Sequence, residues 1–136
     1  MVLNNVTLLD FPRFLDVRGN LSYLQNNDQI PFEIQRVYWI YDVPGGEQSE
    51  GHAFKSLQEI IIALSGSFDV VVNDGKKVQK ITLNRSYYGL YIPKMVWRHL
   101  ENFSTNSLAF IAADQPYNEG DYIKDFQDYQ KGKIEY

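Results

Sequence analysis

Cysteine is absent from this sequence, and histidine occurs only twice. Without thiols the chain can have no disulfide framework, no thiolate metal site and no cysteine nucleophile. Long apolar runs are also missing: none approaches the roughly 20 residues that cross a bilayer, and Met1 to Asp10 lack the basic flank and apolar stretch of a signal peptide. These absences predict a protein of the cytoplasm with no membrane partner.

Charge of one sign is not concentrated anywhere. The formal net charge is −4, and acidic and basic residues are mixed along the chain without a run of like charge. Binding to nucleic acid without sequence preference requires a basic face that neutralises phosphates, so we expect no nucleic-acid partner. The chain has 136 residues and no linker or low-complexity segment, which predicts a single domain over residues 1–136.

Aromatic residues are abundant, with ten Tyr, eight Phe and two Trp. Such rings fill cores and interfaces, and Tyr and Trp can also line a ligand pocket. The rest of the chain consists of short apolar stretches bounded by turn residues, a pattern typical of an all-β barrel or sandwich. The predicted strands cover residues 6–9, 21–24, 32–41, 57–64, 68–72, 76–83, 87–92, 96–100 and 107–112.

One short helix is predicted near the C-terminus. Asn118 can cap its first turn, and Gly132 is expected to end it. Its apolar face would consist of Tyr122, Ile123, Phe126 and Tyr129. An amphipathic helix after a run of strands is expected to brace a barrel.

Two short motifs have the spacing found in cupin barrels. The first corresponds to His52-Ala53-Phe54, Glu59 and Gly66. The second corresponds to Gly89, Pro93-Lys94-Met95, Arg98 and Asn102. The sequence therefore resembles the cupins, which implies an all-β fold: a small cupin-type (RmlC-like jelly-roll) antiparallel β-barrel with a short C-terminal helix.

The residues at the cupin metal positions are unsuited to a metal. Metal-binding cupins use two histidines and a glutamate from the first motif and a third histidine from the second, whereas this chain has Phe54 and Arg98 beside His52 and Glu59. A phenyl ring has no lone pair, and a guanidinium stays protonated, so neither can ligate a metal. We predict no metal and no cofactor, and instead a site for an anionic or carbonyl-bearing ligand.

Further stretches of the chain carry a closer resemblance. They run in order over nearly its whole length: Asp16 to Leu21, Ile30 to Tyr38, His52-Ala53, Lys55, Leu64 to Ser67, Asp74-Gly75, Tyr91 to Trp97, and Asp121 to Ile123. In these stretches the sequence resembles the WxcM-like sugar 3,4-ketoisomerases. The resemblance implies a metal-independent 3,4-ketoisomerase that acts on TDP-4-keto-6-deoxyglucose through an enediol(ate), in making deoxyamino sugars for surface glycans such as lipopolysaccharide O-antigen.

The same resemblance implies a homodimer and a set of site residues. The N-terminal strand, around Val6 to Leu9, is expected to pair with the partner subunit. His52 is predicted to be the base that removes the C3 proton of the sugar, because a neutral imidazole titrates near working pH. The predicted catalytic residues are His52, Tyr38 and Glu59. The predicted substrate-binding residues are Arg18, Arg36, Arg98, Lys55 and Trp97.

Alternation along strands separates some of these side chains. Arg36 and Tyr38 share a strand face and could point into one pocket, with arginine suited to a pyrophosphate. His99 lies on the opposite face from Arg98 and is expected to be structural. Trp97 could stack on the base or belong to the core.

Two positions depart from the family pattern. Ser49 stands where the family has an arginine, and Phe54 stands where it has a histidine or tyrosine that can carry a proton. The loss of one such donor commonly lowers a rate by about 10²–10³. A non-catalytic sugar-nucleotide-binding cupin therefore remains an alternative. A related sugar-nucleotide epimerase is another, although the carboxylate-supported histidine and tyrosine acid that it usually requires are not evident.

Overall fold

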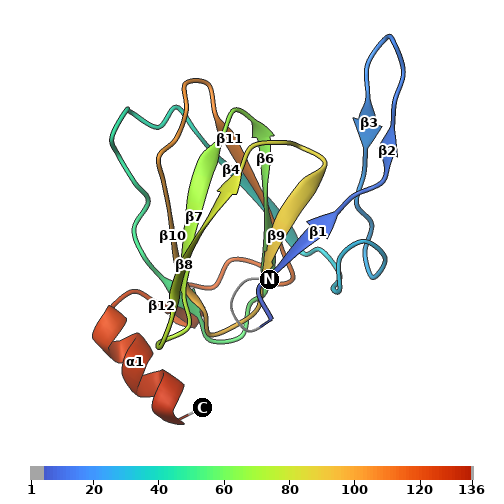
Figure 1. The fold of residues 1–136 in the computed structure, drawn as a ribbon. Helices are drawn as coiled ribbons and strands as arrows, with labels where there is room; N and C mark the ends of the chain where they lie inside the picture. Colours follow the sequence, from blue (N-terminus) through green and yellow to red (C-terminus); the bar gives the residue numbers. More distant parts are fainter. Residues whose placement is uncertain (1–4, 136) are drawn as a thin grey trace.

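The computed structural model describes residues 5–135, which form antiparallel strands and one C-terminal helix (Figure 1). The strands are β1 (Thr7–Asp10), β2 (Arg13–Phe14), β3 (Leu21–Ser22), β4 (Arg36–Tyr41), β5 (Ala53–Phe54), β6 (Glu59–Ser65), β7 (Phe68–Asn73), β8 (Val78–Leu83), β9 (Tyr88–Ile92), β10 (Trp97–Glu101), β11 (Leu108–Ala113) and β12 (Tyr122–Ile123). A 3₁₀ turn, η1 (Glu119–Asp121), precedes β12, and helix α1 (Phe126–Glu135) follows it. Residues 1–4 and 136 lie outside the described residues, and the single domain over 1–136 stays a prediction.

Two larger sheets face each other across the main core. The first has the strand order β1-β9-β6-β11-β4 and the second β10-β7-β8, with every pairing antiparallel. Ile61 and Ile111 from the first sheet and Val70 and Leu83 from the second are buried in one apolar cluster. The predicted jelly roll is confirmed. Among residues 5–135, no backbone pairing between strands joins the two larger sheets. The predicted barrel is therefore open, and side-chain packing holds the two sheets together.

Strand β6 forms the centre of the first sheet and is buried on both faces along most of its length, as predicted. Ile61 faces the main core, whereas Ile60 and Ile62 pack beneath the segment that contains Ile30 and Phe32. This covering segment explains why the strand predicted over 32–41 begins only at residue 36. Its apolar residues are buried against the outside of the sheet instead of pairing within it.

The other predicted strands are present, with ends displaced by at most two residues. The turn predicted between β7 and β8 also forms: the Asn73 side chain accepts a hydrogen bond from the Gly75 amide, and Gly75 has φ +96°. Strands β2, β5 and β12 were not predicted, because pairings of two residues leave no periodic pattern in the sequence.

The C-terminal helix begins later than predicted. Asn118 caps η1, where it accepts from the Gly120 amide, and the chain then enters β12. The Asp125 carboxylate instead caps α1, accepting from the amides of the second and third residues of the helix, and Gly132 lies inside the helix and does not end it. Tyr122 and Ile123 are strand residues because their backbone pairs with β5.

Asp121 ties the C-terminal segment to the loop between β5 and β6. Its carboxylate is buried and accepts hydrogen bonds from the Ser56 amide at 3.0 Å, the Ser56 hydroxyl at 2.7 Å and the Leu57 amide at 3.1 Å. Three donors on one carboxylate fix a loop that would otherwise leave buried amides unbonded. The residues on either side of this loop are thereby held in place.

The N-terminal strand lies at one edge of the first sheet. Within the chain, β1 pairs antiparallel with β9, from Thr7 opposite Tyr91 to Asp10 opposite Tyr88. The other edge of β1 pairs with no strand among residues 5–135, so its pairing with a partner subunit stays a prediction. The hairpin of β2 and β3 projects from the body of the molecule (Figure 1).

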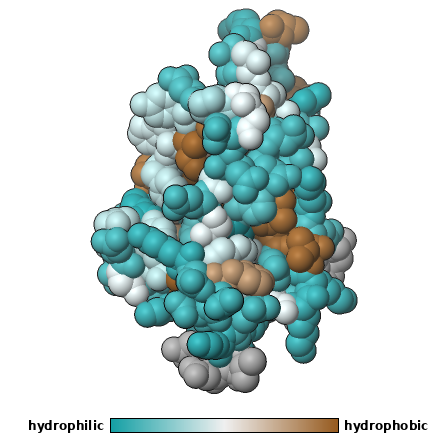
Figure 2. Space-filling view, turned by 90° about the vertical axis from the view of Figure 1, so that its left-hand side faces the viewer, coloured by the Kyte–Doolittle hydropathy of each residue, from teal (hydrophilic) through white to brown (hydrophobic). Residues whose placement is uncertain are grey.

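The surface is mixed in character. Figure 2 shows one face that is largely hydrophilic, with small, separate hydrophobic patches. Among residues 5–135, no helix combines the length and apolarity needed to cross a bilayer.

Candidate active site

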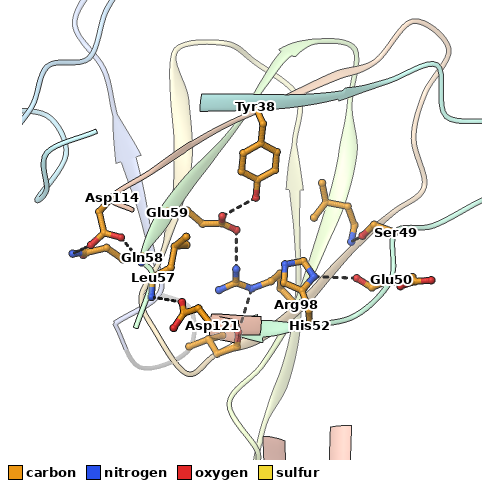
Figure 3. Close-up of polar contacts among 12 residues, drawn as sticks. Tyr38, Ser49, Glu50, His52, Leu57, Gln58, Glu59, Arg98, Asp114 and Asp121 are labelled. Carbon is orange, nitrogen blue, oxygen red and sulfur yellow. Dashed lines mark hydrogen bonds and ion pairs between the residues drawn. The ribbon is translucent and has the colours of Figure 1, made fainter. Parts of the chain in front are cut away.

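Four polar side chains converge between the two sheets (Figure 3). Tyr38 comes from β4 and Glu59 from β6 in the first sheet, and Arg98 comes from β10 in the second. His52 precedes β5 and forms an isolated bridge with Arg98, with backbone N···O distances of 2.8 and 3.0 Å. The sequence prediction that these four residues form one site is matched by their placement.

Glu59 links the two sheets through a buried ion pair. One carboxylate oxygen accepts from Arg98 Nη1 at 2.7 Å, and the other accepts from the Tyr38 hydroxyl at 2.9 Å. Arg98 is 0% exposed and Glu59 is 1% exposed, so both charges are removed from water. A buried charge requires an opposite charge and hydrogen bonds. Here Glu59 and Arg98 provide both for each other.

These neighbours also set the state of the Tyr38 hydroxyl. Burial, and then the negative charge of Glu59, raise the pKa of Tyr38, so the phenol stays protonated at neutral pH. The guanidinium of Arg36 lies over the Tyr38 ring, 4.7 Å from its centroid. Arg36 and Tyr38 therefore share a face of β4, as predicted.

His52 is held as a neutral imidazole with a free lone pair. Its Nδ1 lies 3.2 Å from the Glu50 carbonyl oxygen, and since a carbonyl can only accept, Nδ1 carries the hydrogen and Nε2 the lone pair. Burial, and then the positive charge of Arg98, lower the pKa of His52 to about 4. This is the protonation state that a general base requires.

Three buried nitrogen atoms around this cluster have no hydrogen-bond partner within the described part of the chain: Arg36 Nε, His52 Nε2 and Arg98 Nη2. Buried polar groups are normally satisfied, so such atoms gathered in one place indicate where a ligand supplies the missing partners. The two arginine nitrogens can only donate and the His52 nitrogen can accept. The complementary ligand presents several oxygen atoms and one transferable proton.

One wall of the site is aromatic. Phe54 is fully buried, and its ring centroid lies 5.0 Å from that of His52 and 4.5 Å from that of Tyr122. The Tyr122 and His52 centroids are 5.5 Å apart. Tyr122 was not predicted as a site residue, because its sequence pattern placed it on the C-terminal helix. The available signal was its position in a stretch that resembles the family.

Three predicted binding residues lie away from this cluster. Arg18 is on the projecting hairpin, where its exposed side chain pairs with Asp16 at 2.8 Å. The Lys55 side chain is exposed to solvent. Trp97 lies on the opposite face of β10 from Arg98 and packs against Phe126 of α1, so its placement agrees with a core role and not with base stacking.

Gly51 connects Trp97 to the site. A Cβ atom at Gly51 would lie 2.7 Å from the indole, a distance that no side chain tolerates. The backbone just before His52 therefore lies directly against the ring that supports α1. His99 faces away from the cluster and contacts Glu101 at 2.8 Å, which agrees with the predicted structural role.

The four cupin ligand positions do not fit a metal ion. Glu59 already accepts from Tyr38 and Arg98, and Arg98 brings a permanent positive charge to within 2.7 Å of its carboxylate. Phe54 contributes no lone pair. Within residues 5–135 no group of three or more His, Cys, Asp or Glu side chains is placed to hold a metal. Activity without a metal or cofactor stays a prediction.

Residues 4–133 match the WxcM-like, C-terminal family (FdtA). The chain belongs to this family. The TDP-4-oxo-6-deoxy-α-D-glucose-3,4-oxoisomerase of Aneurinibacillus thermoaerophilus is 36% identical over 124 residues, covering 91% of this chain and 89% of that protein. Among solved structures, the TDP-quinovose 3,4-ketoisomerase of Campylobacter jejuni is 39% identical, with a TM-score of 0.91 over 95% of this chain and 99% of that one. The sugar 3,4-ketoisomerase of Thermoanaerobacterium thermosaccharolyticum, solved with TDP, is 31% identical, with a TM-score of 0.96 over 98% of both chains.

WxcM-like membership confirms the family that the sequence resembles. The RmlC epimerase of Mycobacterium tuberculosis is 15% identical, with a TM-score of 0.78 over 91% of this chain and 70% of that one. Identity this low shows only a shared fold, and it supports the RmlC-like jelly roll.

The buried ion pair generates a stability prediction for this WxcM-like protein. Glu59→Leu leaves the Arg98 charge buried and unpaired, and we expect it to lower the free energy of unfolding by about 3–5 kcal/mol. The double variant Glu59→Leu/Arg98→Met removes both charges and should recover much of that loss. Urea denaturation measures both.

Glu119→Ala is the matched control, because it removes an exposed ion pair with Lys124 that should be worth less than about 1 kcal/mol. Equal losses in the single and double variants at Glu59 and Arg98 would contradict the interpretation.

Proposed function

We propose that this protein is a sugar-nucleotide 3,4-ketoisomerase that converts a TDP-4-keto-6-deoxyhexose to the 3-keto isomer through an enediol(ate). The observation that carries the proposal is the unpartnered Nε2 of a neutral His52 beside the buried Arg98–Glu59 pair. The A. thermoaerophilus relative is named for this reaction. A histidine-to-asparagine variant of the T. thermosaccharolyticum enzyme has been solved with TDP-4-keto-6-deoxyglucose.

The residues of the site have distinct tasks in this reaction. His52 Nε2 removes the proton at C3, and its imidazolium returns that proton at C4. Arg98 Nη2 donates to the sugar oxygen on which negative charge develops, in a site where water is excluded and such a bond is strong. Glu59 is a positioning residue, because it holds the Arg98 guanidinium and the Tyr38 hydroxyl in fixed orientations.

Arg36 is the best-placed arginine for the nucleotide end of the substrate. Its guanidinium is stacked over Tyr38 and its Nε has no partner within the described part of the chain, so it can donate to a pyrophosphate oxygen. Arg98 was predicted to bind the substrate as well. Since Glu59 already neutralises its charge, we assign it to the sugar. A cytoplasmic location and a place in surface-glycan synthesis remain predictions from the sequence.

A non-catalytic binding protein is the second candidate. The observation that favours it is Phe54, which is buried beside His52 and cannot carry a proton. Ser49, at the position of the missing arginine, has its hydroxyl oxygen bonded to the Leu100 amide at 2.7 Å. An epimerase has less support, because the His52 Nδ1 bonds to a backbone carbonyl and not to a carboxylate.

An isotope experiment separates the enzyme from the binding protein. Incubated with TDP-4-keto-6-deoxyglucose in deuterated water, the wild type should exchange the C3 proton and form the 3-keto isomer, both followed by NMR. His52→Asn should lower both rates by at least about 10³ while TDP affinity by calorimetry stays within about twofold, because the base acts on the sugar and affinity comes mainly from the nucleotide. His99→Asn is the control. TDP binding without any exchange by the wild type would favour the non-catalytic alternative.

The pH dependence of kcat/KM tests the state of His52. Because the pKa of His52 lies at about 4, below the ordinary value of 6.5, the imidazole stays neutral as the pH falls through 6.5. We therefore expect kcat/KM to remain level down to roughly pH 5.5 and to decline only as the pH approaches the lowered pKa of His52. An acidic limb centred near pH 6.5 would show that the free enzyme does not hold His52 in this environment.

We also propose that the protein is a homodimer in which the β2–β3 hairpin packs on the second copy. The hairpin exposes apolar side chains to water: Phe14, Leu15, Val17 and Leu21. An exposed apolar ribbon that projects from the body is suited to packing on a second copy. In such a dimer the hairpin could carry Arg18 toward the partner's site.

The dimer is tested by the molecular mass in solution. Light scattering at micromolar concentration should give a dimer for the wild type, and Leu15→Asp/Val17→Asp should give a folded monomer because two charges cannot be buried in the interface. Val78→Asp, at an exposed apolar residue of β8, is the control and should stay dimeric. A monomeric wild type would refute this assembly.

A further inference from the structure

Moving a ketone from C4 to C3 requires the transfer of two protons. One passes from C3 to C4, and His52 is placed to carry it. The other must pass from the hydroxyl on C3 to the oxygen on C4, since the hydroxyl becomes the ketone and the ketone becomes the hydroxyl. The carrier of this second proton must be able both to donate and to accept. The need for such a carrier rests on the proposed function.

The residues already placed in the site do not meet this requirement. Phe54 has no proton to exchange, and the guanidinium groups of Arg36 and Arg98 donate but cannot accept. The Tyr38 hydroxyl already donates its hydrogen to Glu59 at 2.9 Å, and Glu59 is held by Arg98. His52 holds the carbon proton in the intermediate. The set of residues predicted from the sequence therefore lacks a carrier.

Tyr122 lies beside both His52 and Phe54. Its backbone pairs directly with Phe54 across β12 and β5, and its ring contacts both Phe54 and His52, with centroids 4.5 and 5.5 Å away. The Tyr122 hydroxyl has no hydrogen-bond partner among residues 5–135, although the residue is only half-buried and so remains open to a ligand. It is also close enough to Tyr38 to contribute to the raised pKa of that phenol.

We propose that Tyr122 is a catalytic residue that carries the hydroxyl proton from O3 to O4. As His52 takes the C3 proton, the C3–H electrons form the C3–C4 double bond, and O4 takes the proton of the Tyr122 hydroxyl. The Tyr122 oxygen then takes the O3 proton as the C3 carbonyl forms, and C4 recovers a proton from the His52 imidazolium. Tyr122 and His52 end the turnover as they began it, and no oxidant or reductant is consumed.

This assignment explains how a chain with Phe54 in place of a proton-carrying residue can remain an isomerase. A phenol is both a donor and an acceptor, as the transfer requires. The two aromatic residues lie side by side, so a hydroxyl at position 122 and a proton carrier at position 54 would serve the same part of the sugar. One should therefore substitute for the other.

The test compares Tyr122→Phe with the wild type in the deuterium experiment. Tyr122→Phe removes one hydroxyl that bonds to nothing within residues 5–135, so the fold and TDP affinity should be retained. We expect kcat for the 3-keto product to fall by about 10²-fold with little change in KM, the size of a lost proton-transfer group. Exchange of the C3 proton should fall less than product formation, because His52 still takes that proton.

Rescue and a matched control complete the design. Adding Phe54→His to Tyr122→Phe should restore product formation by at least about tenfold, a recovery that a merely structural tyrosine would not allow. Tyr41→Phe, at an exposed tyrosine on the outer end of β4, should match the wild type. A kcat for Tyr122→Phe within twofold of an active wild type overturns this assignment alone. A wild type that neither exchanges nor isomerises overturns the proposed function itself.

Discussion

The buried ion pair between Glu59 and Arg98 is the interaction on which the site depends. It joins β6 of the five-stranded sheet to β10 of the three-stranded sheet, at a place where backbone hydrogen bonds do not connect them. The same carboxylate orients Tyr38, and burial together with the positive charge of the same guanidinium lowers the pKa of His52. One pair of charges thus connects the two sheets, orients a phenol and contributes to the protonation state of a base.

A large part of this arrangement could be predicted from the sequence. The cupin spacing placed His52, Glu59 and Arg98 together, since motif positions on neighbouring strands face one interior, and alternation placed Arg36 beside Tyr38. Alternation also separates Trp97 from Arg98, which is why Trp97 supports the helix. The strands of the two large sheets were predictable because their apolar pattern is long enough to read.

The features that the sequence did not predict depend on tertiary contacts. Tyr122 carries a helix-like pattern but forms a strand, because its backbone finds Phe54 and the neighbouring Asp121 accepts three donors from a distant loop. The partners that decide such a segment lie more than 60 residues away, and no local period contains them. The pairing of β1 with β9 was not predicted for a similar reason: it depends on the register between distant strands, which composition does not specify.

The contact between Gly51 and Trp97 makes Trp97 an intrinsic fluorescent probe of the site. The chain has two tryptophans, of which Trp39 is 55% exposed and Trp97 is enclosed by Phe126 and Tyr129. Emission from Trp97 therefore reports on the docking of the C-terminal helix, and the same indole touches the backbone that precedes His52. In a Trp39→Phe variant, the intrinsic fluorescence of Trp97 therefore reports on whether the backbone beside His52 keeps its position.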